Sequence, residues 1–174
     1  MFDVAKTYRV PVAAPAAVVY DSIEGYDFRA SRMVRLLMAL RGYRRLPGPA
    51  KPAGLIPSLT ARGFVPLGGR PGRELVFGLA GKFWTPSGGL RPLSAAEFEA
   101  FDEEGCAKAA WNVTVEAVGG EASMLSTETR VRCYGAGARR RFRIYWSTIE
   151  IFSGIIRMAM LRGIRDRALS RRSP

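Results

Sequence analysis

Alternating apolar and polar positions mark two long strands in the second half of the chain. Tryptophan and valine alternate with polar residues from position 106 to 118, and a similar alternation runs from 123 to 134. Strict alternation over this length is typical of a strand with one buried face. Gly119 and Gly120 separate the two runs, so the pattern predicts an antiparallel hairpin.

A second period, of three to four residues, begins near residue 138 and continues to about residue 169. Aromatic and aliphatic side chains recur at this spacing from Phe142 to Ile164. This period predicts one long C-terminal helix with an apolar side that packs on the rest of the protein. Gly154 and Gly163 either weaken this helix or mark close packing or a kink.

The start of the chain predicts one strand and two short helices. Residues 2–13 are rich in β-branched and aromatic side chains, which favour a strand. Pro15 opens the first helix, which ends at Gly25, and Ser31 is a suitable N-cap for a second helix over residues 32–41. The expected buried side of the first helix comprises Val18, Val19, Ser22 and Ile23.

The centre of the chain predicts loops, two short strands and a short helix. Residues 46–63 hold four prolines and three glycines, which indicates a loop that is either a lid or a connector. Two strands are expected over residues 64–67 and 73–80, joined by a glycine-rich turn. Ser94 and Glu97 have the spacing of a capping box, which predicts a helix over residues 95–101.

Positive charge is concentrated at the C-terminal end of the chain. The net charge is +12, and residues 135–174 contain ten basic and two acidic side chains. Such a charge attracts polyanions and anionic membranes without sequence specificity. The densest cluster lies at the start of the long helix, where it is either a solvated face or an anion site, and comprises Arg139, Arg140, Arg141 and Arg143.

The composition excludes several kinds of chemistry. The chain has no histidine, which excludes Ser-His-Asp and Cys-His catalysis and every metal site that requires imidazole. The glycine-rich turn at residues 68–72 is not followed by Lys-Ser/Thr and a helix, so it is not a phosphate loop. We therefore expect no metal, no cofactor and no catalytic constellation.

Cys106 and Cys133 fall in the predicted strands, where we expect them to be small buried apolar residues. A disulfide between neighbouring strands is the alternative.

The N-terminal part of the chain does not have the pattern of a membrane or export segment. The N-terminus contains Asp3 and Lys6 and has no long apolar run. Prolines interrupt the apolar stretch over residues 10–20, which is shorter than the ~20 residues of a spanning helix. The sequence thus predicts a soluble, cytoplasmic protein.

The order of these elements resembles the START-like helix-grip (SRPBCC) superfamily. Residues 10–20 look like its first strand and its "Ala-Pro, helix" entry, and residues 126–131, 139–146 and 153–157 are similar to an uncharacterised bacterial branch. The resemblance implies a single α+β domain over residues 1–174, in which a curved antiparallel sheet wraps around the long C-terminal helix. Two short helices would follow the first strand, and residues 169–174 would form a basic tail.

In that superfamily a cavity lies between the sheet and the long helix. The resemblance therefore implies that the chain binds a hydrophobic or amphipathic small molecule, either lipid-like or polyketide-like. The side chains expected to line the cavity are Phe77, Phe83, Trp84, Trp111, Thr127, Thr129, Tyr145, Trp146, Phe152 and Met160.

Two other functions remain open at this point. A cyclase- or hydratase-type enzyme would need an acid or base in the cavity, from Asp21, Asp27, Glu128 or a tyrosine. Glu128 and Arg130 share the more polar strand face, so we expect them in solvent, paired for instance with Glu116. A register slip of one residue would turn both into the cavity. The third hypothesis is a peripheral binder of anionic membranes or nucleic acid through the arginine clusters.

Overall fold

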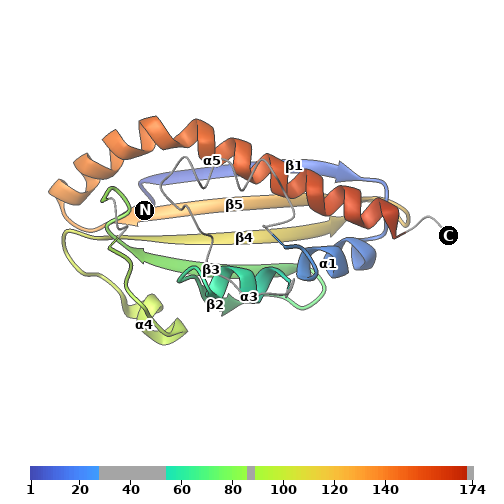
Figure 1. Ribbon diagram of the computed structural model, residues 1–174, viewed down its shortest axis with the longest axis horizontal. Coiled ribbons are helices and arrows are strands. Elements are labelled where there is room, and N and C mark those ends of the chain that lie inside the picture. The colour runs from blue at the N-terminus through green and yellow to red at the C-terminus, as the bar shows by residue number, and fades with distance from the viewer. Residues whose placement is uncertain (28–53, 86–88, 172–174) are drawn as a thin grey trace.

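The structure is a computed structural model that describes residues 1–27, 54–85 and 89–171, and its centre is an antiparallel sheet (Figure 1). Neighbouring strands lie in the order β1-β5-β4-β3-β2. Their bounds are Val4–Val12 for β1, Val65–Gly68 for β2, Glu74–Gly81 for β3, Ala107–Ala117 for β4 and Ser123–Cys133 for β5.

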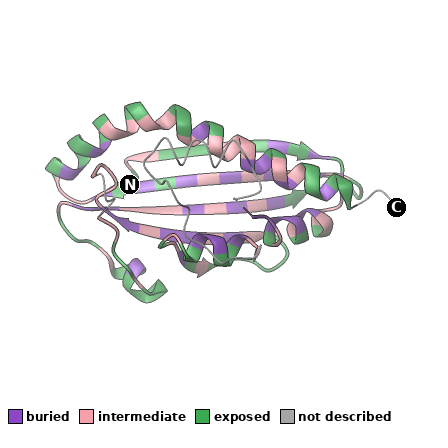
Figure 2. Ribbon diagram, in the orientation of Figure 1, coloured by how far each residue is buried: buried purple, intermediate pink, exposed green. Residues whose placement is uncertain are grey.

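The predicted hairpin is the longest pairing in this sheet. β4 and β5 pair antiparallel over their full lengths, with Trp111 opposite Thr129 and Val113 opposite Thr127. Buried positions alternate along both strands, as Figure 2 shows, and these positions form the inner face of the sheet. The turn between the strands includes Gly119 at φ 76°, a conformation that glycine adopts without strain.

The long helix α5 (Ala136–Ser170) runs along the sheet (Figure 1). It begins two residues before the position expected from the sequence, directly after Gly135. The first helix α1 (Ala16–Glu24) follows Pro15, ends at Gly25 and packs beside the C-terminal half of α5. Five antiparallel strands with a long C-terminal helix give the expected α+β helix-grip arrangement.

The predicted loop over residues 46–63 is wrong in part. Helix α3 (Leu55–Thr60) lies inside it and buries Leu55, Ser58 and Leu59. Pro57 is compatible with this helix because it occupies the first turn, where a backbone N–H has no intrahelical partner. The rest of the predicted loop and the helix expected over residues 32–41 lie outside the described residues.

Helix α4 (Ala95–Ala100) packs on the outer face of the sheet. Its capping box is present: Ser94 Oγ accepts from the Glu97 amide, and the Glu97 carboxylate accepts from the Ser94 amide. The ring of Phe98 lies directly over Gly78 of β3, where a Cβ atom would come within 2.8 Å of the ring. Gly78 is therefore required by close packing.

The two glycines of α5 also mark close packing. A Cβ atom at Gly154 would lie 2.7 Å from Tyr8 Oη of β1, and one at Gly163 would lie 2.7 Å from the ring of Tyr26. Both positions bring the helix backbone against an aromatic side chain. This confirms the packing alternative for both residues.

Candidate functional site

The inner face of the sheet carries two separate apolar clusters. The larger cluster joins α1, α3 and the C-terminal half of α5 to the sheet through residues such as Val12, Leu125 and Ile164. The smaller cluster surrounds Phe142 near the start of α5 and includes Val131 and Cys133. Polar side chains lie on the inner face where the two clusters meet.

We call these residues the polar centre: Tyr8, Trp111, Thr127 and Thr129 on the strands, with Ser153 and Arg157 on α5. Trp111 Nε1 donates to Thr127 Oγ1 at 2.6 Å, and Thr127 Oγ1 donates to the Asn112 carbonyl at 2.6 Å. Both bonds are made inside the protein, since Thr127 is fully buried. They fix the orientation of the indole, which also stacks on Phe77 with a centroid separation of 5.5 Å.

Arg157 brings a cation from α5 into the polar centre. Its Cζ lies 6.0 Å from the centre of the Trp111 ring, and its Nε donates to Ser153 Oγ at 3.3 Å. Its Nη1 is inaccessible to solvent and has no hydrogen-bond partner. Burial lowers the pKa of this guanidinium to about 10, while the nearby Tyr8 acts in the opposite direction.

Thr129 contributes a second unsatisfied group. It lies opposite Trp111 on one side and opposite Lys6 on the other. Its hydroxyl oxygen is buried and has no hydrogen-bond partner. Buried polar atoms are rarely left in this state, so this pair of atoms, Thr129 Oγ1 and Arg157 Nη1, needs an explanation.

An ion pair between β1 and α5 lies at the surface beside the polar centre. Lys6 Nζ lies 2.5 Å from Glu150 Oε1 of α5, and this contact raises the pKa of Lys6. Next to this pair is a surface hollow lined by Tyr8, Gly154 and Met158 among others. Glu150 is therefore engaged by Lys6 and does not neutralise Arg157.

The expected cavity-lining residues divide into three groups. Phe77, Trp111, Met160, Thr127 and Thr129 are buried on the inner side, between the sheet and α5. Phe83, Trp84, Tyr145 and Trp146 gather around Phe142, with ring centroids 5.7 to 6.5 Å from it. Phe152 is 45% exposed, so the expectation that it lines the interior is wrong, because it lies off the buried stripe of α5.

Glu128 and Arg130 lie on the outer face of β5, as the alternation predicts. Thr127 and Thr129 are buried, while Arg130 is exposed and Glu128 only partly covered. Their expected pairing across strands is wrong, because Arg130 Nε instead donates to Glu128 Oε1 on the same strand at 2.9 Å. Glu116 lies opposite Met124, too far along the hairpin to meet Glu128.

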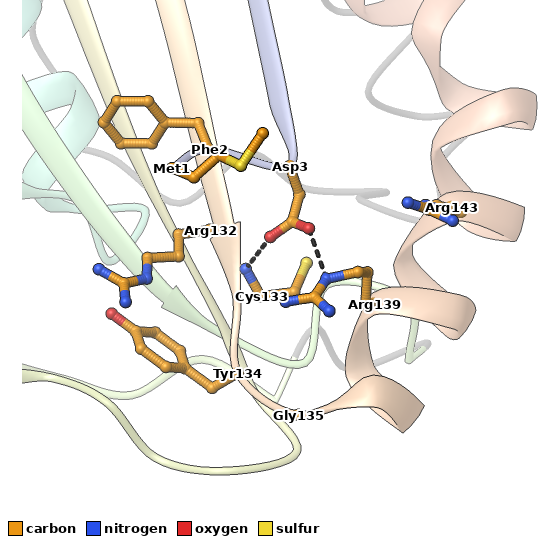
Figure 3. A pocket seen from close by; sticks show the side chains of 9 residues that line it. All are labelled: Met1, Phe2, Asp3, Arg132, Cys133, Tyr134, Gly135, Arg139 and Arg143. Carbon is orange, nitrogen blue, oxygen red and sulfur yellow. Dashed lines mark hydrogen bonds and ion pairs between the residues drawn. The ribbon is translucent and has the colours of Figure 1, made fainter.

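The arginine cluster at the start of α5 does not converge on one point. Arg139 Nε binds Asp3 Oδ1 at 2.6 Å, and Asp3 also accepts from the Cys133 amide (Figure 3). Arg139 and Arg143 line a surface hollow of about 710 Å³ together with Arg132. Arg140 and Arg141 are exposed and do not line this hollow.

The carboxylates considered for catalysis lie away from the polar centre. Asp21 is exposed on α1, and Asp27 is buried, where it accepts from Ser58 Oγ at 3.5 Å. Cys106 and Cys133 are both buried and free, and burial raises the pKa of Cys133 to about 11. Among the described residues, no three acidic or cysteine side chains form a group that could hold a metal.

Arg157 is not among the site residues predicted from the sequence, although a signal is present. It is the one cation in the largely apolar run from Ile149 to Leu161, and it lies three residues before Met160 and seven before Ile164. This spacing places it on the buried stripe of the helix. Comparison of the arginine with its helical neighbours would have marked it as a candidate, although the spacing does not give the rotation of the helix against the sheet.

Comparison with known proteins gives no family assignment. No family model matches the chain, and no curated protein matches it. Among solved structures, similarity is found to the Zhui aromatase/cyclase from Streptomyces sp. R1128, with 15% identity and a TM-score of 0.35 over 97% of this chain and 94% of that one.

Two larger proteins show similarity at the same level. The di-domain aromatase/cyclase StfQ of steffimycin biosynthesis matches with 15% identity and a TM-score of 0.37, over 97% of this chain and 52% of that one. The di-domain BexL of BE-7585A biosynthesis matches with 15% identity and a TM-score of 0.35, over 95% and 50%. This chain thus spans about half of each di-domain protein. TM-scores below 0.5 establish neither a common activity nor a common ligand.

Proposed function

We propose that this protein binds a hydrophobic or amphipathic small molecule between the sheet and α5. The observation that carries the proposal is the polar centre itself, which lies beside the larger apolar cluster and includes the unpartnered Thr129 Oγ1 and Arg157 Nη1. A helix and sheet that served only to pack together would bury an apolar core without unsatisfied polar atoms. Apolar walls with a few convergent polar groups are typical of a small-molecule site.

The side chains around the polar centre suit such a ligand. Trp111 and Phe77 lie on the sheet at the polar centre, and Tyr145 and Trp146 lie on α5 in the smaller cluster around Phe142. Aromatic rings provide large contact areas with little loss of conformational entropy. We propose binding in preference to a reaction because Asp21, Asp27 and Glu128 lie outside the polar centre and Glu150 is paired with Lys6. Of the acids and bases considered for catalysis, Tyr8 lies in the polar centre, where no described carboxylate accompanies it.

Blocking the inner face tests this proposal. Ala109 of β4 points inward, between Val131 and Leu79 on the neighbouring strands. We expect Ala109→Phe to reduce the affinity for the neutral fluorescent probe N-phenyl-1-naphthylamine by at least about tenfold, because the ring would occupy ligand space. Affinity is measured by fluorescence titration.

The matched control is Ala117→Phe, at the exposed end of the same strand. It adds the same ring outside the proposed site and is expected to bind the probe as the unaltered protein does. Equal loss in both variants, or no binding by the unaltered protein, would contradict the proposal.

A second candidate function is docking on an anionic membrane surface. Ile144, Ile151, Phe152 and Ile155 of α5 are exposed by 42% to 69%. Arg140 and Arg141 precede this stripe along the helix, and Arg162 lines the surface hollow beside Ile151 and Ile155. An exposed apolar helix side bordered by cations is suited to the interface of an anionic bilayer. By length and composition α5 could also cross a membrane, but here it packs on the sheet.

Vesicle co-sedimentation tests this second candidate. We expect binding to vesicles that contain phosphatidylglycerol, weaker binding to phosphatidylcholine alone, and a decrease as salt screens the arginines. Replacing Ile151 and Ile155 by Ser should abolish binding, whereas Ile56→Ser, at an exposed isoleucine of α3, should not. Retention of binding by the double variant, or self-association through this face without vesicle binding, would exclude the candidate.

A further inference from the structure

The positive charge of Arg157 is not balanced by a carboxylate among the described residues. Its Nη1 is buried without a partner, and no described carboxylate forms an ion pair with the guanidinium. A guanidinium with a pKa of about 10 still carries its proton at neutral pH. The side chain is partly buried, and an inaccessible charged N–H group without a partner destabilises the protein unless an anion accompanies it.

The groups that face Arg157 do not supply that anion. Tyr8 on β1 is a phenol, Trp111 on β4 presents its ring, and Ser153 on α5 accepts only from Nε. The ion pair between β1 and α5, Lys6 with Glu150, has no net charge. The polar centre therefore has one net positive charge, which matches a monoanion better than a dianionic phosphate.

We propose that Arg157 and Thr129 form the binding site for the carboxylate of an amphipathic carboxylic acid. This inference rests on the function proposed above and adds the chemical class of the ligand. Both side chains lie beside Trp111, since Thr129 is its cross-strand neighbour and Arg157 lies over its ring. The apolar body of the acid would lie among the aromatic side chains between the sheet and α5.

The chemistry of the two groups fits a carboxylate. Arg157 Nη1 provides charge-assisted N–H donors, which form strong hydrogen bonds with carboxylate oxygens. The Thr129 hydroxyl can donate to the same group, which would satisfy the second buried polar atom. A neutral ligand of the same shape would leave the guanidinium without an anion.

Matched acid and neutral probes test the inference on the full chain. The probes are decanoate with methyl decanoate, and naphthalene-2-carboxylate with naphthalene-2-carboxamide, titrated into protein freed of bound lipid. We expect each acid to bind at least about tenfold more tightly than its neutral partner, as for a hydrogen bond to a charged group. Arg157→Met should reduce this preference to within about twofold, and Arg157→Lys should retain part of it.

The control is Arg165→Met, which removes a cation from the same helix at a surface site paired with Asp166. It should leave the preference for acids unchanged. Thermal melting of every variant shows that it is folded, and the comparison of acid and neutral probes on the unaltered protein needs no variant.

The possible outcomes separate the two proposals. Equal affinity for acid and neutral probes overturns the carboxylate site and leaves small-molecule binding intact. A preference that survives in Arg157→Met overturns the role of Arg157. Failure of all four probes to bind overturns the proposed function, and the carboxylate site with it.

Discussion

At the residue scale, Arg157 lowers the stability of the ligand-free protein and is the group that we propose binds the carboxylate of the ligand. The inaccessible, unpartnered Nη1 of the partly buried Arg157 destabilises the ligand-free protein, and an apolar side chain of similar length removes that penalty. We predict that Arg157→Met raises the free energy of unfolding of the ligand-free protein by about 1–3 kcal/mol. Urea denaturation measures the change.

The surface variant Arg165→Met provides the comparison for this prediction. Its arginine pairs with the neighbouring Asp166 in solvent, so its loss should change the free energy of unfolding by less than about 0.5 kcal/mol. A decrease in stability for Arg157→Met would mean that the guanidinium makes net favourable contacts in the ligand-free protein. The account of an unbalanced charge would then be wrong.

At the scale of elements, the ring of Phe98 over Gly78 joins α4 to the sheet, together with hydrogen bonds from Lys108 Nζ to two carbonyls of α4. Phe98 is 6% exposed, and an added Cβ atom at Gly78 would overlap its ring. We predict that Gly78→Ala lowers the free energy of unfolding by roughly 1–3 kcal/mol, as overpacking does elsewhere. Denaturant titration measures the effect.

Two further variants test the cause of that loss. Gly137→Ala, in the first turn of α5, meets nothing within 4 Å and should not destabilise the protein. In a Phe98→Ala background, Gly78→Ala should cost much less, because the ring it opposes is gone. A cost that is the same in both backgrounds would show that α4 packing is not responsible.

At the scale of the whole molecule, periodicity predicted the elements that span it. Period-two alternation predicted β4 and β5 and which face of each strand is buried. The helical period predicted α5 to within two residues. Both signals extend over more than ten residues, so one irregular position does not obscure them. Helix α3 was missed because its six residues are too few for a period and include Pro57.

The candidate site was less predictable than the fold. Burial of Thr127 and Thr129 followed from alternation along one strand, whereas the environment of Arg157 depends on how α5 is rotated against β1 and β4. Phe152 was assigned to the interior because it continues the spacing of three to four, although that spacing fits two neighbouring stripes of a helix. The sequence alone does not give the rotation that separates these stripes.

Native mass spectrometry of the freshly purified protein, with organic extraction of anything released, tests the central claim most directly. The account predicts a discrete added mass that corresponds to an amphipathic carboxylic acid and that is lost in Arg157→Met. Retention of the same mass by that variant, or a retained molecule without an acidic group, would contradict the account.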